Sequence, residues 1–372
     1  MGRTTRAQSL CLLILVVSVR AAAFEIQDGK LSINGFGSWG FGWSNHGNTY
    51  DIAQPDGNFG VGEFALALTG RLSDRAVAGA QFRVSSDRRA NLDWVFGEWR
   101  FSDRASLRVG ILKHPIGIFG EIPRVGTLRP FFLLPQGLYG STEFTGSGVE
   151  GLSLAGSLAV FGRWNLSYDL YGGSLKLPVV NVSDKLNPTN LQPGGRVVSA
   201  TEETKYIFGG RIVAATPIDG LDLRLSAYGT PLSEANGPRV VMGPSIQYLG
   251  EKFSARWEYF FFFEQGEPHD RQRVHTAYLE AAYFLTEQIQ IGARAEIYRL
   301  YLLHGSTSSL LEHNELAATL NYWFTPGFVI KASVHAIDGN RFAAPLALDD
   351  ALLAGGLDRH TLAGFIGAQF SF

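Results

Sequence analysis

Alternation of apolar and polar side chains recurs along most of this chain, and it constrains the fold more than any other feature. In the stretch EFALALTGRL, Phe64, Leu66 and Leu68 fall on one face of an extended backbone. Glu63 and Thr69 fall on the other face. Successive side chains of a β-strand point to opposite faces, whereas a helix repeats every 3.6 residues. The sequence therefore predicts strands with one apolar and one polar face.

Sixteen segments show this alternation, and after residue 23 no apolar run approaches the length of a membrane-spanning helix. A sheet that crosses a membrane has to close on itself, since lipid cannot satisfy its edges. We therefore predict an all-β fold, a closed antiparallel transmembrane β-barrel of about 16 strands. The predicted strands are 31–44, 59–72, 76–86, 91–101, 106–115, 147–160, 164–173, 204–215, 221–230, 239–248, 253–264, 274–285, 288–302, 311–324, 328–337 and 360–372.

The connections between these segments are alternately short and long. The short ones resemble one another, as LSDRA at 72–76 and FSDRA at 101–105 do. The long ones include 45–58, 116–146 and 174–203. Tight turns at one rim and longer loops at the other are the layout of outer-membrane barrels. A soluble β-sandwich would also alternate, but it seldom needs so many strands.

The first 23 residues have the pattern of a secretory signal peptide. Two arginines precede the apolar run from Leu10 to Val19, and three alanines end the segment. The run is too short for a membrane anchor, which needs about 20 apolar residues. The single cysteine, Cys11, lies within this peptide, so the exported chain has no disulfide. We expect residues 24–372 to form one barrel domain in the bacterial outer membrane.

The exported chain carries a small negative charge. Residues 1–23 hold three of the 32 basic residues and no acidic residue, which leaves 29 basic against 34 acidic residues. Such a chain has no basic excess with which to displace the counterions of a nucleic acid. We therefore expect no nucleic-acid partner.

The last segment, HTLAGFIGAQFSF, is predicted to close the barrel. It would place Leu362, Ile366 and Phe370 toward lipid, together with the terminal Phe372. The aromatic end resembles the signal by which the barrel-assembly machinery reads bacterial outer-membrane proteins, although Phe365 occupies a position where that signal has a polar residue. The resemblance implies that Phe372 contacts this machinery. Outer-membrane lipid and lipopolysaccharide are the other partners expected for such a barrel.

The stretch 107–151 contains the pattern R-x-G-x-x-x-x-P-x-G followed by R-x-x-x-x-R-P-x-x-x-L-P-Q-x-x-Y. It is similar to the porin-type outer-membrane proteins of many proteobacteria, over about forty residues. Its connection follows the fifth predicted strand and is rich in apolar residues, which need a place to bury. The resemblance implies an inward-folded constriction loop at about 116–146, a passive channel for small hydrophilic solutes or ions, and in many relatives a homotrimer.

The polar strand faces would line a water-filled lumen, because sixteen strands enclose more space than side chains fill. Each charge on these faces has two interpretations that we weigh equally: it selects solutes, or it pairs with a neighbour and supports the wall. The predicted lining and constriction residues are Arg83, Glu98, Glu121, Arg124, Arg129, Glu143, Arg256, Glu258, Glu280, Arg294 and Glu296.

Motifs for other chemistry are weak. GFGSWG at 35–40 formally matches a dinucleotide loop, but Trp39 and Phe41 continue a strand through it. HNEL at 313–316 lacks a second histidine at the spacing of a zinc site. We therefore predict no catalytic residue, no metal and no cofactor. The alternatives are a barrel enzyme of the lipase or protease type and a channel specific for anions or oligosaccharides. The 340–360 segment could form a lid helix, cap the mouth or touch another subunit.

Overall fold

The computed structural model describes residues 24–26, 30–48, 50, 53–85, 89–102, 104–140, 144–146, 148–159, 162–182, 186–187, 190–191, 197–204, 206–231, 238–264, 272–302, 311–342 and 359–372. The predicted signal peptide, Glu143 and residues 343–358 of the proposed lid lie outside these ranges. Among the described residues, no helix is both long enough and apolar enough to cross a membrane.

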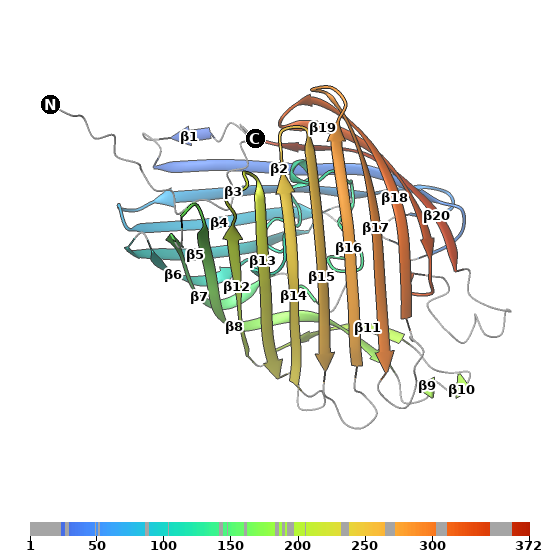
Figure 1. Cartoon of the computed structure of the whole chain (residues 1–372), viewed down its shortest axis with the longest axis horizontal. Helices are drawn as coiled ribbons and strands as arrows, with labels where there is room; N and C mark the ends of the chain where they lie inside the picture. Colours follow the sequence, from blue (N-terminus) through green and yellow to red (C-terminus); the bar gives the residue numbers. More distant parts are fainter. Residues whose placement is uncertain are drawn as a thin grey trace.

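Sixteen antiparallel strands form a closed barrel, which confirms the predicted fold class. Figure 1 shows β2–β6 running across the molecule behind the upright β13–β18. Each strand hydrogen-bonds to a neighbour on both sides, so the sheet has no open edge. The barrel strands are β2 (Leu31–Ser44), β3 (Asn58–Arg71), β4 (Ala76–Ser85), β5 (Ala90–Ser102), β6 (Ala105–Leu112), β7 (Val149–Ala159), β8 (Asn165–Val182), β12 (Ile207–Ala215), β13 (Leu221–Pro231), β14 (Pro238–Leu249), β15 (Phe253–Glu264), β16 (Gln272–Phe284), β17 (Ile289–Leu302), β18 (Leu311–Thr325), β19 (Phe328–Asp338) and β20 (His360–Ser371).

The seam of the barrel lies where β20 pairs with β2, as the sequence predicts. Gly37 lies opposite Phe370, and this ladder runs from Phe36 to Ser44 of β2. At its end, Gly35 and Phe372 exchange two backbone hydrogen bonds of 2.9 Å. The ring of Phe372 fills the space beside Gly35, where a Cβ atom would lie 2.2 Å from the ring. The terminal aromatic residue is therefore part of the closed sheet.

The alternation of the sequence appears as two different surfaces of the wall. On β15, Arg256, Glu258 and Phe260 face inward and are buried. The outward residues are large and apolar, and Leu316 and Phe208 are 68% and 66% exposed. Apolar side chains on the outer face suit a hydrocarbon environment, whereas the polar side chains on the inner face are shielded from it by the wall.

The predicted loop 174–203 is wrong in part, because much of it is strand. β8 continues to Val182 and pairs there with β11 (Val197–Glu203), beyond the ladder that it forms with β12. The run LKLPVVNV is rich in β-branched residues, which favours an extended hairpin over an irregular loop. The remaining short elements are β1 (Phe24–Ile26), β9 (Leu186–Asn187), β10 (Asn190–Leu191) and the 3-10 helix η1 (Gly126–Leu128).

Gly110 on β6 is required by its backbone. Its φ is 141°, and an added Cβ would lie 2.1 Å from the carbonyl oxygen of Val95. Gly97, on the paired strand β5, has open space at the same position. We predict that Gly110→Ala lowers the free energy of unfolding by about 1–3 kcal/mol, the usual cost of a strained backbone.

The matched control is Gly97→Ala, which we expect to change the free energy of unfolding by less than about 1 kcal/mol. Denaturant titration of the detergent-folded protein, followed by tryptophan fluorescence, measures both values. Equal stabilities for the two variants would contradict this account of Gly110.

Candidate functional site

The described residues of the connection between β6 and β7 (113–140, 144–146 and 148), called the segment below, lie inside the barrel. Its backbone amides donate hydrogen bonds to inward side chains of three strands. Gly117 N donates to Ser226 Oγ on β13 over 3.1 Å, and Ile118 N donates to Glu258 Oε2 on β15 over 2.9 Å. Gly137 N donates to Glu296 Oε2 on β17 over 3.0 Å. These contacts fix the segment against the inner wall.

Carbonyl groups of the same segment accept hydrogen bonds from other strands of this wall. Three side chains reach it in this way: Arg294 Nη1 donates to Leu133 O over 2.9 Å, Asn321 Nδ2 to Pro130 O over 2.8 Å, and Lys331 Nζ to Gly126 O over 2.7 Å. Buried backbone polar groups cost free energy unless they are paired. The polar inner face of β13–β19 therefore serves as hydrogen-bonding support for the segment.

Apolar side chains of the segment fill one side of the barrel interior. Phe119 and Phe144 are almost completely buried and pack in one cluster with Phe260, Phe262 and Tyr228 of the wall. Phe132 and Leu133 form a second cluster, with Phe365 of β20. Burying a side chain of this size stabilises a fold by about 1.5–3 kcal/mol. The apolar residues that made this connection unusual in sequence thus find their place inside the barrel.

Glu258 is the centre of one polar network beneath the segment. Its side chain is fully buried, and it accepts hydrogen bonds from Tyr139 and Tyr278 over 2.5 and 2.7 Å, besides that from Ile118 N. Ser245 Oγ donates to it as well, over 2.5 Å. Glu258 therefore anchors the segment in the barrel.

The predicted lining residues of β15–β17 face inward, but the segment covers them. Arg256 pairs with Glu280 over 3.2 Å, and Arg294 pairs with Glu296 over 2.7 Å. All four side chains are at most 6% exposed. The structure thus brings these residues together with Glu258 as one buried wall. Among the two interpretations of their charge, wall support is the one that this burial favours.

Arg129 holds the segment in shape. Its guanidinium donates to Phe131 O over 3.3 Å and to Phe132 O over 2.8 Å, and it also donates to Pro123 O. These acceptors belong to the segment itself, so Arg129 ties two of its turns together.

The remaining predicted residues lie toward the side of the interior that β3–β6 form. Arg83 and Glu98 belong to these strands, whereas Glu121 and Arg124 belong to the segment. Arg83 pairs with Asp93 over 2.9 Å, and Arg108 pairs with Glu98 over 2.7 Å. From the segment, Arg124 reaches across to Glu63 on β3 over 3.0 Å. Side-chain exposure rises to 28% at Arg108 and 39% at Arg124. Solvent-accessible charges of the interior therefore gather here.

Glu121 connects the two sides. Arg211 of β12 donates to Glu121 over 2.5 Å and to Asp169 of β8 over 2.8 Å. Burial raises the pKa of Glu121, but Arg211, Arg108 and Lys113 together outweigh it and hold the pKa below its ordinary value. Glu121 is therefore ionised at neutral pH.

Sequence reasoning missed several charges of this site, among them Glu63, Asp93, Arg100 and Arg108. Glu63 was visible as a polar residue in the alternation of its strand. Asp93 and Glu98 differ in parity, so strict alternation would place them on opposite faces of β5. The register of β4 with β5 shifts between Gln81 and Phe82, and both acidic side chains consequently pair with inward arginines. A β-bulge of this kind cannot be read from the period alone.

Solved structures with a similar fold are outer-membrane proteins. The Salmonella typhi OmpF complex with daunomycin aligns with a TM-score of 0.58 at 10% sequence identity, over 94% of this chain and 100% of that one. The outer membrane channel DcaP of Acinetobacter baumannii gives 0.58 at 8% identity over the same shares. An anion-selective porin from Comamonas acidovorans gives 0.55 at 10%, over 92% and 99%.

The chain thus has the fold of a porin-type barrel. No protein-family model and no curated protein sequence matches it. At 8–10% identity, the likeness concerns the backbone architecture, which these proteins share over nearly their whole length.

Arg294 offers a test of the buried wall. Its guanidinium lies between the opposed carboxylates of Glu296 and Glu315, and it caps Leu133 O. We predict that Arg294→Ala lowers the free energy of unfolding by about 3–5 kcal/mol, because removal of one partner leaves buried charges uncompensated. Denaturant titration in detergent measures this loss.

Arg163→Ala is the matched control. Arg163 pairs with Asp219, but their side chains are 72% and 98% exposed, so water already solvates both charges. We expect no measurable change in its free energy of unfolding. A stability of Arg294→Ala equal to that of the wild type would refute the supporting role of the buried pair.

Proposed function

We propose that this chain is an outer-membrane channel through which small hydrophilic solutes or ions diffuse. The observation that carries the proposal is the asymmetry of the barrel interior. The 113–148 segment fills the side formed by β13–β20, whereas the β3–β6 side keeps charged, solvent-accessible groups. A water path would run along β3–β6, with the segment narrowing it.

Charges of both signs face this path from each of its two sides. The segment contributes Glu121, Arg124 and Lys113, and the wall contributes Glu63, Asp93 and Glu98 with Arg83, Arg100 and Arg108. Fixed charges of both signs across a narrow passage orient polar solutes and disfavour apolar ones. The signs nearly cancel, so a strong ion preference is not expected from them. The arginines supply planar donors suited to carboxylates or phosphates, which supports a weak preference for anions.

The outer surface supports a place in the bacterial outer membrane. Large apolar side chains such as Leu316, Leu320 and Ile366 are exposed on it, and closed barrels are the β-structures that lipid tolerates. The similar solved structures are proteins of this membrane. Three further features stay predictions: contacts with lipopolysaccharide, assembly through Phe372 and a homotrimeric state. One similar structure, OmpT of Vibrio cholerae, is described as a trimer form.

Planar-bilayer recording of the purified protein tests the function directly. We expect discrete conductance steps for the wild type. Arg124→Ala removes a cation that is 39% exposed in the path, so its reversal potential in a salt gradient should shift toward cations. Arg163→Ala, at an exposed turn, serves as the control and should conduct like the wild type. A wild-type protein without conductance steps would refute the channel, and hydrolysis of lipid or peptide by it would favour an enzyme.

Lys113 should make this selectivity depend on pH. Burial lowers the pKa of Lys113 from its ordinary value to about 8, against the opposing effects of Glu121 and Asp93. The amine is charged below this pKa and neutral above it, so the path loses one positive charge as the pH rises through about 8. We predict that, between pH 7 and 9, the reversal potential changes in the direction of a greater preference for cations.

Lys113→Gln is the control, because it removes the titrating amine and keeps a polar side chain of similar length. Its reversal potential should stay constant over the same pH range. An equal shift in the wild type and in Lys113→Gln would assign the titration to another group.

A further inference from the structure

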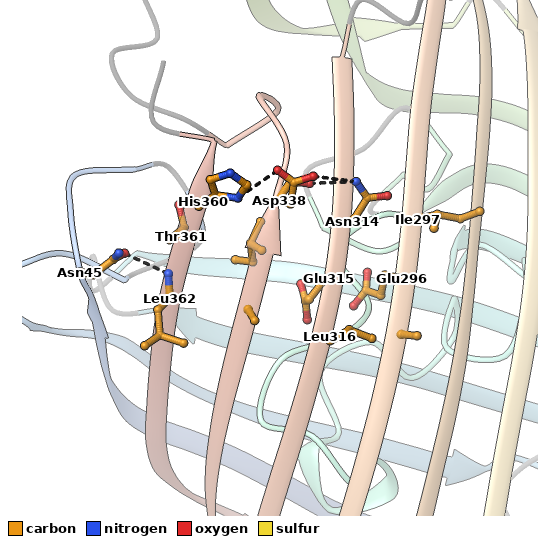
Figure 2. Close-up of a pocket in the computed structure, with 13 residues that line it drawn as sticks. Asn45, Glu296, Ile297, Asn314, Glu315, Leu316, Asp338, His360, Thr361 and Leu362 are labelled. Atoms are coloured by element: carbon orange, nitrogen blue, oxygen red, sulfur yellow. Dashed lines mark hydrogen bonds and ion pairs between the residues drawn. The ribbon is translucent and has the colours of Figure 1, made fainter. Parts of the chain in front are cut away.

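Two carboxylates lie directly opposite each other on the inner face of the barrel. Glu296 on β17 and Glu315 on β18 are register partners, and Figure 2 shows their side chains next to each other on these neighbouring strands. Like charges directly opposite in an antiparallel pair are destabilising. Both residues are at most 2% exposed, so water does not screen them. Arg294 lies between the two carboxylates and supplies one positive charge for both of them.

His313 completes a cluster of potential ligands with this pair. It precedes Glu315 by two residues on β18, and therefore shares its inward face. One ligand atom from each of Glu296, His313 and Glu315 can be chosen such that all three lie within 4.8 Å of one another. Each of the three residues is buried. This spacing is close enough for one ion to contact all three.

Polar atoms of this cluster are left without hydrogen bonds among the described residues. Both ring nitrogens of His313 are buried and have no such partner, although Nε2 lies 3.2 Å from Glu315 Oε2 in an ion-pair contact. Glu296 Oε1 also accepts none, with Arg294 Nε 2.7 Å away. Within the described part of the chain, His313 Nδ1 has no partner of either kind, and a buried ring nitrogen of this sort is costly unless something else occupies its lone pair. A metal ion is one such occupant.

The charges around the cluster leave an excess of negative charge. Glu280 pairs with Arg256, and Arg294 lies within 4 Å of Glu280, Glu296 and Glu315. Three carboxylates thus share two guanidinium groups. One further positive charge would balance the cluster, and a proton on a carboxylate or an imidazole, or a bound cation, can supply it.

We propose that Glu296, His313 and Glu315 bind one divalent transition-metal ion, of which Zn²⁺ is the best representative. One imidazole and two carboxylates are donors that Zn²⁺ accepts, whereas Ca²⁺ and Mg²⁺ prefer oxygen alone. The ion would cross-link β17 and β18. This site is separate from the water path along β3–β6, so it does not depend on the proposed channel function.

Neighbouring groups orient the ligands as the outer shell of a metal site does. His335 Nδ1 on β19 lies 2.8 Å from Glu315 Oε1, and Tyr50 Oη donates to Glu315 Oε2 over 2.5 Å. Gly137 N donates to the other oxygen of Glu296. The rings of Tyr50 and Phe342 lie 6.0 and 5.1 Å from that of His313 and cover it. Such partners fix ligand orientation and raise metal affinity.

Zinc binding by the full, detergent-folded protein tests this inference. After chelator treatment and dialysis, we expect calorimetric titration with Zn²⁺ to show one ion per chain. The zinc-loaded protein should also unfold at a higher temperature than the metal-free protein. His313→Gln and Glu296→Gln should each weaken the association at least about tenfold, since losing a ligand costs no less than losing an orienting partner. His360→Gln removes an imidazole that is 85% exposed, and it should bind Zn²⁺ like the wild type.

The titration can overturn the proposal in two ways. A wild-type protein that takes up no Zn²⁺ would exclude the site. Equal binding by His313→Gln, Glu296→Gln and the wild type would place the ion elsewhere. Heat-modifiable electrophoretic migration checks that each variant is folded; if one is not, the other and the wild type still decide. Co²⁺ in the wild-type protein gives an independent readout, because Co²⁺ in a four-coordinate protein site absorbs visible light much more strongly than the octahedral aqueous ion.

Discussion

Closure of the sheet is the constraint on which the rest of this structure depends. Lipid offers no hydrogen bonds, so every backbone amide and carbonyl of a spanning strand has to be paired within the protein. The ladder between β20 and β2 satisfies the two strands that would otherwise be edges. It also determines the size of the interior, because the strand number sets the diameter. The barrel is consequently wide enough to hold the described residues of the segment between β6 and β7.

Filling part of this interior creates two environments from one polar surface. Where the segment packs, on β13–β20, inward charges become buried and have to be paired, as Arg294 is with Glu296. Where it does not pack, on β3–β6, charges such as Arg108 stay partly accessible. The same residue types therefore form buried pairs in the wall on one side and partly solvent-accessible pairs on the other. This division also explains how the cluster of Glu296 and Glu315 is buried in a barrel that keeps partly accessible charges on another side.

Several parts of the fold were predictable because they depend on local pattern. The sixteen strands, their tight turns and the closing role of residues 360–372 follow from a period of two and from the cost of an unpaired edge. The β8–β11 hairpin was missed although its β-branched run favours a strand. Its ladder lies beyond the one that β8 forms with β12, and local alternation does not reveal such a change of partner. The candidate site was predictable only in part. Glu121 and Arg124 do lie in the interior, but the burial of Arg256 and Glu258 depends on a segment more than a hundred residues away.

The sequence by itself determined which face of each strand is apolar and that the two ends of the barrel meet, because alternation and backbone pairing are properties of short stretches. The tertiary structure alone decided which inward charges are covered, which ones meet across strands and which stay in contact with water. His313 illustrates the difference: its own stretch, HNEL, lacks the spacing of a metal site. Its partner Glu296 comes from the neighbouring strand, at a register that the hydrogen-bond ladder fixes.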